Sequence, residues 1–388
     1  MTTEPNAKHP ATLTIHDFGQ IADVALDLGD LTVLVGAQGT GKSLALQWLK
    51  VALDGHHVVR ALKDAGHDVS QPRTLVDLIF GVGMGEAWRD GSEVTFGGVR
   101  VDPASLKKGR SEAERLFFIP AHRSMLISDG WASPFQKLSA DTPVVARIFS
   151  QNLFDRFSAR GGGPLFPVSR KLKEAYRDRI QSAIFHGGSV GLEQDAQHAK
   201  RLKLTHGKAQ LPFMTWTAGQ REFTPLLLGL YHLLPSTKQA KQPGVEWVVI
   251  EEPEMGLHPE AINVVLLLVL DLLWRGYKVV LSTHSPHVLT AVWMLQRLRS
   301  LGADWRLLCR AFGMGNSSSL RPVAEAALTK EYRVHLLAFQ KDGKVRSTDI
   351  SQLDPDAEGT AESEWGGLTG YSSRFGEAVR AAVNEKAP

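Results

Sequence analysis

Eight residues near the N-terminus have the types and the spacing needed to bind phosphate groups. Residues 36–43 read Gly-Ala-Gln-Gly-Thr-Gly-Lys-Ser and fit the pattern G-x-x-x-x-G-K-[ST]. An apolar, β-branched run at 31–35 precedes them, and residues 44–53 after them have helical periodicity. Phosphates held by this loop would therefore meet the N-terminus of a helix. This context favours a nucleotide-binding P-loop over a chance glycine turn.

Each residue of the loop has an expected part in binding. Backbone N–H groups close around phosphate oxygens where glycines permit it, and the residues expected to line the phosphates are Gly36, Gln38, Gly39, Thr40 and Gly41. Lys42 would place its charge on the β- and γ-phosphates and act in catalysis, and the Ser43 hydroxyl would be a ligand of Mg²⁺. The sequence therefore predicts ATP and Mg²⁺ as cofactors.

A second apolar run, at 245–250, ends in two glutamates, Glu251 and Glu252. This has the form of a Walker B strand. We assign Glu251 to the metal through water and Glu252 to the attacking water as general base. Glutamate at the first position departs from the more usual aspartate. The alternative is a solvated strand end, which is disfavoured because the strand is apolar and its end would face the P-loop.

Two further segments could contact the γ-phosphate. His284 follows the predicted strand 277–281, where an imidazole can hydrogen-bond this phosphate and sense its loss. Lone histidines are usually structural, but the position at a strand end favours a functional role. Residues 217–220 read Thr-Ala-Gly-Gln, and Thr217, Gly219 and Gln220 would begin a helix able to offer N–H groups.

These residues require an α/β framework. Strand 245–250, helix 259–275 and strand 277–281 form a parallel crossover unit, which places functional residues at the carboxyl ends of the strands. The predicted fold is a P-loop NTPase with a mixed, partly parallel sheet flanked by helices, plus a helical insertion. It divides into an N-terminal lobe with the P-loop (1–123), a helical, basic insertion (124–215), a C-terminal lobe (216–300), and a strand hairpin and helix that complete the head (301–388).

Three local predictions lie outside the site. Residues 169–184 read as an amphipathic, arginine-rich helix, and residues 305–310 and 333–339 read as strands. The stretch 151–210 holds 11 Lys and Arg against 5 Asp and Glu. That excess predicts either a nucleic-acid-facing surface or a solvated insertion. No aromatic interleaving of the kind that stacks bases stands out there.

Composition excludes several classes of protein. Of the 388 residues, 43% are hydrophobic and 22% are charged, as in ordinary globular proteins, and a net charge of +3 argues for no particular partner. The single cysteine, Cys309, excludes an intrachain disulfide framework. No signal peptide is visible, and the most apolar run, 261–274, is too short to span a membrane and contains Asp271. We expect a cytoplasmic protein without a membrane partner.

Taken together, the segments 36–43, 217–220, 248–252 and 282–284 resemble the ABC-type ATPase head of SMC-like and RecF-like proteins. More narrowly, residues 251–259 (EEPEMGLHP) and 282–289 (STHSPHVL) are similar to the AAA-15/AAA-21 group. That group includes the ATPase portion of OLD-family nucleases and stand-alone ATPases of phage-defence and toxin–antitoxin operons.

The resemblance implies a head-to-head dimer in which Thr217, Gly219 and Gln220 act in trans on the nucleotide of a second copy. Two departures stand out. Threonine-alanine replaces the usual serine-glycine start, and no Q-loop glutamine follows strand 116–119. Arg123 lies where that glutamine would be, and we take it as a candidate phosphate or interface contact.

OLD-family proteins append a Toprim nuclease, which needs a metal-binding D-x-D and a domain's length of chain. Here the one D-x-D after His284 is Asp354–Asp356 in a polar loop, so we expect no such domain. The sequence then predicts an ATP-hydrolysing dimerisation switch that controls a separate effector protein, in phage defence. The alternative is a DNA-binding repair or maintenance ATPase of RecF or SMC type.

Overall fold

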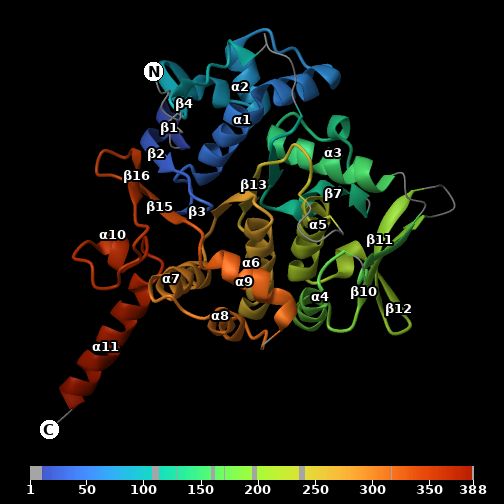
Figure 1. Ribbon diagram of the computed structural model, residues 1–388. Coiled ribbons are helices and arrows are strands. Elements are labelled where there is room, and N and C mark those ends of the chain that lie inside the picture. The colour runs from blue at the N-terminus through green and yellow to red at the C-terminus, as the bar shows by residue number, and fades with distance from the viewer. Residues whose placement is uncertain are drawn as a thin grey trace, which may run out of the picture.

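A single large sheet with helices on both faces forms the body of the molecule (Figure 1). The computed structural model describes residues 11–106, 113–128, 130–158, 162–169, 171–194, 199–235, 241–315 and 317–386. The sheet has ten strands in the order β5-β4-β1-β2-β16-β15-β3-β14-β13-β6. In chain order these are β1 (Thr12–Phe18), β2 (Ile21–Asp27), β3 (Leu31–Val35), β4 (Trp88–Phe96), β5 (Val99–Arg100), β6 (Leu116–Ile119), β13 (Trp247–Glu251), β14 (Lys278–Ser282), β15 (Tyr332–Phe339) and β16 (Val345–Asp349).

Half of the sheet is parallel. β15, β3, β14, β13 and β6 run in one direction, while β4, β1 and β2 pair antiparallel beside them. The parallel strands read as nearly continuous apolar runs, as expected for strands covered on both faces. The predicted hairpin near the C-terminus is present, and its first strand, β15, lies directly beside β3. The predicted mixed sheet is therefore confirmed.

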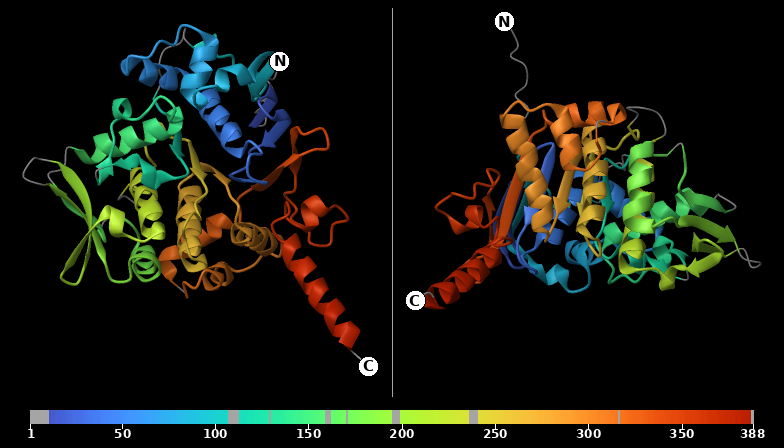
Figure 2. Two further views of the ribbon diagram at one scale, coloured as in Figure 1. Left: turned by 180° about the vertical axis from the view of Figure 1, so that it is seen from behind. Right: turned by 90° about the horizontal axis from the view of Figure 1, so that it is seen from below.

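Alternate residues of the central strands enter two separate cores. Leu31, Val33 and Val35 of β3 belong to one cluster, and Leu34 belongs to the other. The helices of the body and of the C-terminal part are α1 (Lys42–Asp64), α2 (Pro72–Phe80), α5 (Ala218–Leu233), α6 (Pro259–Trp274), α7 (Pro286–Ser300), α8 (Trp305–Ala311), α9 (Arg321–Ala327), α10 (Thr360–Ser363) and α11 (Gly370–Lys386). Helices α1 and α2 supply the core on one face, and α5, α6, α7 and α9 supply the core on the other. The sheet is thus the middle of three layers (Figure 2).

The insertion differs from the prediction of a helical segment. Two helices, α3 (Val144–Ser158) and α4 (Glu174–Ile180), are present, but a four-stranded antiparallel sheet accounts for much of the rest. Its strands are β9 (Gly163–Phe166), β10 (Ser189–Gln194), β11 (Lys200–His206) and β12 (Ala209–Pro212). Leu202 and Leu204 of β11 are buried while their neighbours are charged or polar. This alternation is the pattern of a strand with one buried face, and it explains why the region forms a sheet rather than a helix.

Two local predictions were also wrong. Residues 305–310 form helix α8 rather than a strand, because Trp305, Leu308 and Cys309 are buried at helical spacing and the Asp304 side chain caps the N-terminus. The helix predicted over 169–184 begins only at Glu174. Within the described ranges, no helix has both the length and the apolar character needed to cross a membrane.

Candidate functional site

The predicted site residues meet at one edge of the sheet. The P-loop follows β3, Glu251 ends β13, and His284 follows β14, and these three strands are parallel neighbours. The register pairs Glu251 with Ser282, and Ser282 with Leu34. The carboxyl ends of the strands therefore coincide, as the crossover connection requires.

Backbone geometry explains the glycines of the P-loop. Gly36, Gly39 and Gly41 have φ values of 146°, 75° and 83°, a range that side-chain-bearing residues rarely adopt. At Gly36 a Cβ would also lie 2.1 Å from the carbonyl oxygen of Leu337 on β15. The loop is thus packed directly against the C-terminal hairpin. No alanine fits at its first position.

Lys42 is already enclosed by the loop. Its Nζ atom donates to the carbonyl oxygens of Gly36 at 2.8 Å and Ala37 at 2.9 Å, and only 6% of the residue is exposed. Burial lowers the pKa of Lys42, an effect opposed by Glu252 and its two neighbouring glutamates. A bound phosphate would therefore draw the Lys42 ammonium away from these carbonyl oxygens. A bound anion would replace two neutral carbonyl partners with a charge.

Glu251 is a buried carboxylate with one unused oxygen. The Ala121 N–H donates to its Oε2 at 3.1 Å, whereas Oε1 has no hydrogen-bond partner among the described residues. Burial raises the pKa of Glu251, and the nearby Ser43 hydroxyl and the Ala121 N–H act in the opposite direction. A hard oxygen ligand beside a hydroxyl suits Mg²⁺. The residues present therefore fit the predicted metal site, with Ser43 and Glu251 as the groups that would hold it.

Glu252 differs from its neighbour in both backbone and exposure. Its φ is 42°, an unusual value for a non-glycine residue, and its N–H donates to the Ser282 carbonyl at 2.9 Å. The side chain is 31% exposed, and Oε1 lies 3.7 Å from Nε2 of His284. Strained backbone of this kind collects at functional sites. Glu252 and His284 thus form a half-exposed pair beside the buried Glu251.

A third acidic residue positions His284. Oε1 of Glu254 accepts hydrogen bonds from the Thr283 hydroxyl and from the His284 N–H, both at 2.7 Å. The carboxylate therefore ties the loop after β13 to the loop after β14. Glu254 was not among the predicted site residues. Its place in the run Glu251-Glu252-Pro253-Glu254 was the available signal.

The structure corrects the prediction for Arg123. Its guanidinium is fully buried and donates to the carbonyl oxygens of Glu251 at 2.8 Å, Glu252 at 3.3 Å and Glu222 at 3.3 Å. Burial lowers the pKa of Arg123, and Glu222 is the largest opposing influence. With its donors used in this way, the side chain does not present a charge to a phosphate. It instead joins helix α5 to the end of β13.

The segment 217–220 begins α5 with a capping box. The Gln220 N–H donates to the Thr217 hydroxyl at 3.3 Å, and the Thr217 N–H donates to Gln220 Oε1 at 3.2 Å. The Gln220 amide also donates to the Ile184 carbonyl at 3.0 Å. Gln220 is thus committed within its own chain, whereas Thr217 and Ala218 are exposed. None of the described residues of the P-loop hydrogen-bonds to this segment.

Gly219 allows the start of α5 to approach the loop after β13. A Cβ on Gly219 would lie 2.7 Å from the Gly256 carbonyl oxygen. The two segments line a cavity of about 360 Å³ together with His186 and His258. The start of α5 therefore lines this separate cavity and does not face the P-loop of the same chain.

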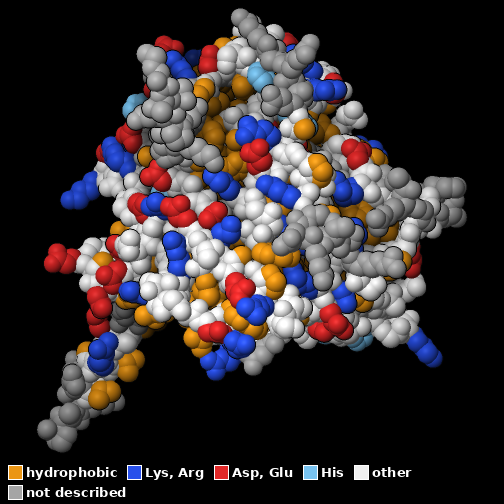
Figure 3. All heavy atoms as spheres, in the orientation of Figure 1, with side chains coloured by type: hydrophobic (Ala, Val, Ile, Leu, Met, Phe, Trp, Pro, Cys, Tyr) orange, Lys and Arg blue, Asp and Glu red, His pale blue; other side chains and the backbone are white. Residues whose placement is uncertain are grey.

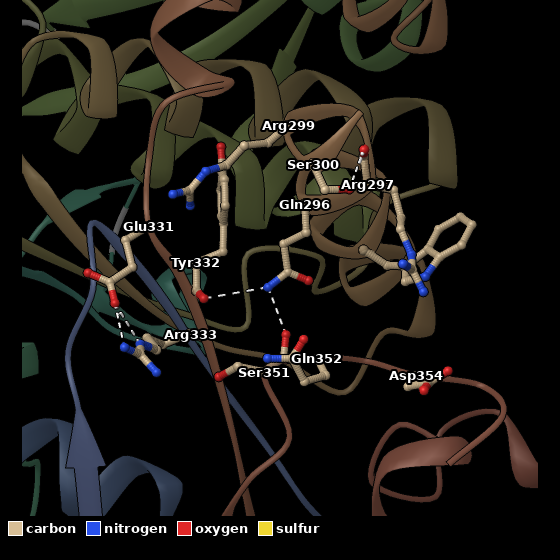
Figure 4. Close-up of a pocket in the computed structure, with 11 residues that line it drawn as sticks. Gln296, Arg297, Arg299, Ser300, Glu331, Tyr332, Arg333, Ser351, Gln352 and Asp354 are labelled. Atoms are coloured by element: carbon tan, nitrogen blue, oxygen red, sulfur yellow. Dashed lines mark hydrogen bonds and ion pairs between the residues drawn. The ribbon is translucent and has the colours of Figure 1, made fainter. Parts of the chain in front are cut away.

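Another cavity, of about 600 Å³, lies between α7 and the C-terminal hairpin (Figure 4). Gln296 donates to the Ser351 carbonyl at 2.7 Å, and Arg333 pairs with Glu331 at 2.6 Å. None of the predicted site residues lines it. Most of its polar side chains join α7 to β15 and to the segment after β16, which indicates a structural role for this cavity rather than a binding role.

Residues 176–290 match the family model described as "AAA domain, putative AbiEii toxin, Type IV TA system". The matched segment contains the start of α5, the two glutamates after β13 and His284, and the P-loop lies before it. The predicted resemblance to the ABC-type ATPase heads of the AAA-21 group is thereby confirmed. The fold is that of an α/β P-loop NTPase, with a mixed, partly parallel sheet between layers of helices.

Solved structures with a similar fold include three SMC heads. They are a "SmcHead bound to the C-winged helix domain of ScpA" (TM-score 0.45, 12% identity, 88% of this chain and 97% of that chain), an "SMC head domain from Thermotoga maritima" (0.38, 11%, 88% and 98%), and an Smc head domain with an extended coiled coil bound to the C-terminal domain of ScpA from Pyrococcus furiosus (0.43, 10%, 88% and 96%). No curated protein matches the chain.

Proposed function

We propose that this protein binds ATP with Mg²⁺, hydrolyses it, and uses the cycle as a dimerisation switch that controls a separate effector protein. The observation that carries the proposal is the convergence of three neighbouring strand ends on one site. That site combines a P-loop lysine, a buried carboxylate with an unused oxygen, and a half-exposed glutamate–histidine pair. Phosphoryl transfer to water needs these parts.

The residues divide the chemistry between them. The P-loop N–H groups and Lys42 would hold the phosphates, and Ser43 and Glu251 would hold the metal ion. When bound, Mg²⁺ neutralises charge on the phosphates. Glu252 then accepts a proton from the attacking water at its exposed carboxylate, and His284 contacts the γ-phosphate. Glu254 keeps the His284 backbone in place through its hydrogen bond.

The second half of the site comes from another copy. Within one chain, the exposed start of α5 makes no hydrogen bond to a described P-loop residue, yet its first N–H groups suit a γ-phosphate. A face-to-face pair of heads would bring these groups to the nucleotide of the other chain. Hydrolysis would then release the pair. Because the Gln220 side chain and the Thr217 N–H are both used within their own chain, we assign the trans contact to the backbone N–H groups of Ala218 and Gly219.

The effector is expected to be a separate protein. The family description that matches residues 176–290 names toxin–antitoxin systems, and we extend this to control of an effector in phage defence. A pull-down with the Glu252→Gln chain and ATP tests this. The trapped head should retain the effector, and Lys42→Ala should not.

A DNA-binding ATPase is the second candidate, and β11 supports it. This strand carries Lys200, Arg201 and Lys203 on the small sheet that projects from the body (Figure 1). Fluorescence anisotropy with duplex DNA distinguishes the two functions. A steep loss of affinity between low and moderate salt, reduced by Arg201→Glu, would favour DNA binding. Absence of binding at low salt, together with a retained protein partner, would favour the effector switch.

A further inference from the structure

The C-terminal helix α11 carries an apolar stripe that the described part of its own chain leaves exposed. Tyr371, Phe375, Val379 and Val383 follow one another at a spacing of four residues, so they lie along one side of the helix. Their exposed fractions are 45%, 68%, 64% and 63%. The helix projects away from the body in both views (Figures 1 and 2), and hydrophobic side chains are visible along it in Figure 3.

A helix in this position needs a partner to be stable. Most of the stability of protein helices comes from packing of an apolar face rather than from intrinsic helix propensity. Gly376 in its interior costs about 1 kcal/mol relative to alanine. An exposed apolar stripe on a projecting helix is also unusual for a surface without an interaction partner.

We propose that α11 pairs antiparallel with α11 of a second copy of this chain, without need of nucleotide. The sizes of the stripe residues favour this occupant. With a two-fold axis that crosses the stripe face at the level of residue 377, Tyr371 lies opposite Val383 of the other copy, and Phe375 lies opposite its Val379. Each large ring then meets a small valine, and the two helix axes stay equally far apart along their length.

The parallel arrangement lacks this match. It would place the ring of Tyr371 against its own copy and Val383 against its own copy, so the helices would be forced apart at one end and leave a gap at the other. The antiparallel pair also brings the opposite ends of the two helix dipoles together. Charged residues do not interrupt the stripe, because Arg374, Glu377 and Arg380 lie off it on the helical wheel.

The consequence concerns the ATPase heads. Two heads joined through α11 would meet at a raised effective concentration, so closure over ATP becomes an event within one assembly. This consequence rests on the proposed dimerisation switch, but the pairing does not. The pair of stripes, which presents two aromatic rings and two valines from each copy, would supplement the contact between the heads.

Sedimentation velocity of the full chain without nucleotide tests the pairing. We expect the natural sequence to be dimeric at micromolar concentration, and Phe375→Asp to raise the dimer dissociation constant at least tenfold. Glu377→Gln is the matched control on the opposite side of the helix and should leave the constant unchanged. The body should keep its melting temperature in both variants, because these side chains are exposed. A monomeric natural chain, or a dimer that Phe375→Asp does not weaken, would overturn the proposal.

Cysteine cross-linking tests the register. The single natural cysteine, Cys309, is buried, so background is low. A Tyr371→Cys chain mixed with a Val383→Cys chain of different length should form a disulfide between the two. Either variant alone should cross-link at least tenfold less, because 12 residues separate the positions by ~18 Å along the helix. Stronger cross-linking of each variant with itself would contradict the antiparallel pairing.

Discussion

The P-loop and the start of α5 are the two halves of the proposed nucleotide site, and they differ in how many of their functional groups already have partners within one chain. At the P-loop, Lys42 is enclosed and the Glu251 carboxylate is buried beside the Ser43 hydroxyl. At the start of α5, Thr217 and Ala218 remain exposed, and the local contacts are the capping box between Thr217 and Gln220 and the hydrogen bond from Gln220 to Ile184. This difference fits the proposal that folding of one chain assembles the P-loop half of the site and that a second chain supplies the other half.

The P-loop half is anchored by a buried ion-pair network. Lys50 of α1 donates to Asp54 at 2.7 Å, to Glu114 at 2.7 Å and to the Leu116 carbonyl at 2.6 Å. Asp54 in turn accepts from the Leu116 N–H at 2.9 Å and has non-helical backbone angles that kink α1. The helix that follows the P-loop is thereby tied to strand β6. Removing one member of such a network is strongly destabilising.

The largest expected effect is that of Lys42→Ala. Without the ammonium group the P-loop loses its charged contact with the phosphates, and a hydrogen bond to a charged group is worth ~1.5–3 kcal/mol. We expect the dissociation constant for ATP to rise about a hundredfold, measured by calorimetry. Lys63→Ala, an exposed lysine on the same helix, is the control. Unchanged ATP affinity in Lys42→Ala would remove the phosphate-binding assignment.

Glu252→Gln separates binding from chemistry. The amide keeps the size of the side chain but cannot accept the proton, and general-base catalysis contributes ~10²–10⁴ in rate. We expect unchanged ATP affinity, hydrolysis slowed at least a hundredfold, and accumulation of closed heads, detected as ATP that stays bound to the protein through size-exclusion chromatography. Glu260→Gln at the start of α6 should behave like the natural chain. Normal turnover in Glu252→Gln would transfer the role of base to Glu254.

Arg123→Gln tests the connection between the two halves. Because the guanidinium joins Glu222 of α5 to the end of β13, its loss should misplace the start of α5 relative to Glu252. We expect ATP affinity within about threefold of the natural value and hydrolysis reduced about tenfold. Arg123→Lys, which keeps the charge without the fork of donors, should recover only part of the rate. Equal losses in affinity and rate would indicate a general structural role instead.

The smallest expected effect concerns Glu251 and pH. Burial raises the pKa of Glu251 in the folded state. The carboxyl group therefore contributes its full stabilisation of the folded state only below its unfolded-state pKa. That stabilisation is lost as the pH rises through the folded-state pKa. Glu251→Gln should therefore stabilise the nucleotide-free protein at neutral pH by about 1 kcal/mol, while thermal stabilisation by Mg²⁺ and ATP is lost. A neutral-pH destabilisation, measured by chemical unfolding, would contradict this account of the buried charge.

Much of the site could be predicted from sequence because its signals are local. Three parallel strands, each followed by a short run of functional residues, bring the P-loop, Glu251, Glu252 and His284 together by topology alone. The role of Arg123 had no such signal, since its partners Glu222, Glu251 and Glu252 lie about a hundred residues away. The same holds for Gln20, whose side chain donates to the Gly39 carbonyl at 2.9 Å.

The insertion was misjudged for a different reason. Strand β11 contains three cationic residues, and only Leu202 and Leu204 show the period-two pattern that packs it against the body. The composition of this stretch indicates a charged surface, whereas the burial of two side chains determines that it forms a strand. In α8, the buried positions Trp305, Leu308 and Cys309 carried the helical spacing, but the helix is too short for that pattern to be distinguished reliably from a strand.

A mixing experiment tests the composite site most directly. Lys42→Ala removes phosphate binding from its own chain, and Ala218→Asp places a carboxylate at the exposed start of α5, where it would repel the γ-phosphate without opposing the helix dipole. Each variant alone should be inactive. In an equal mixture, half of the dimers pair an intact P-loop with an intact α5 start, so ATPase activity should return to roughly a quarter of the natural rate. A mixture that stays inactive would contradict the account, because each site would then be completed within one chain.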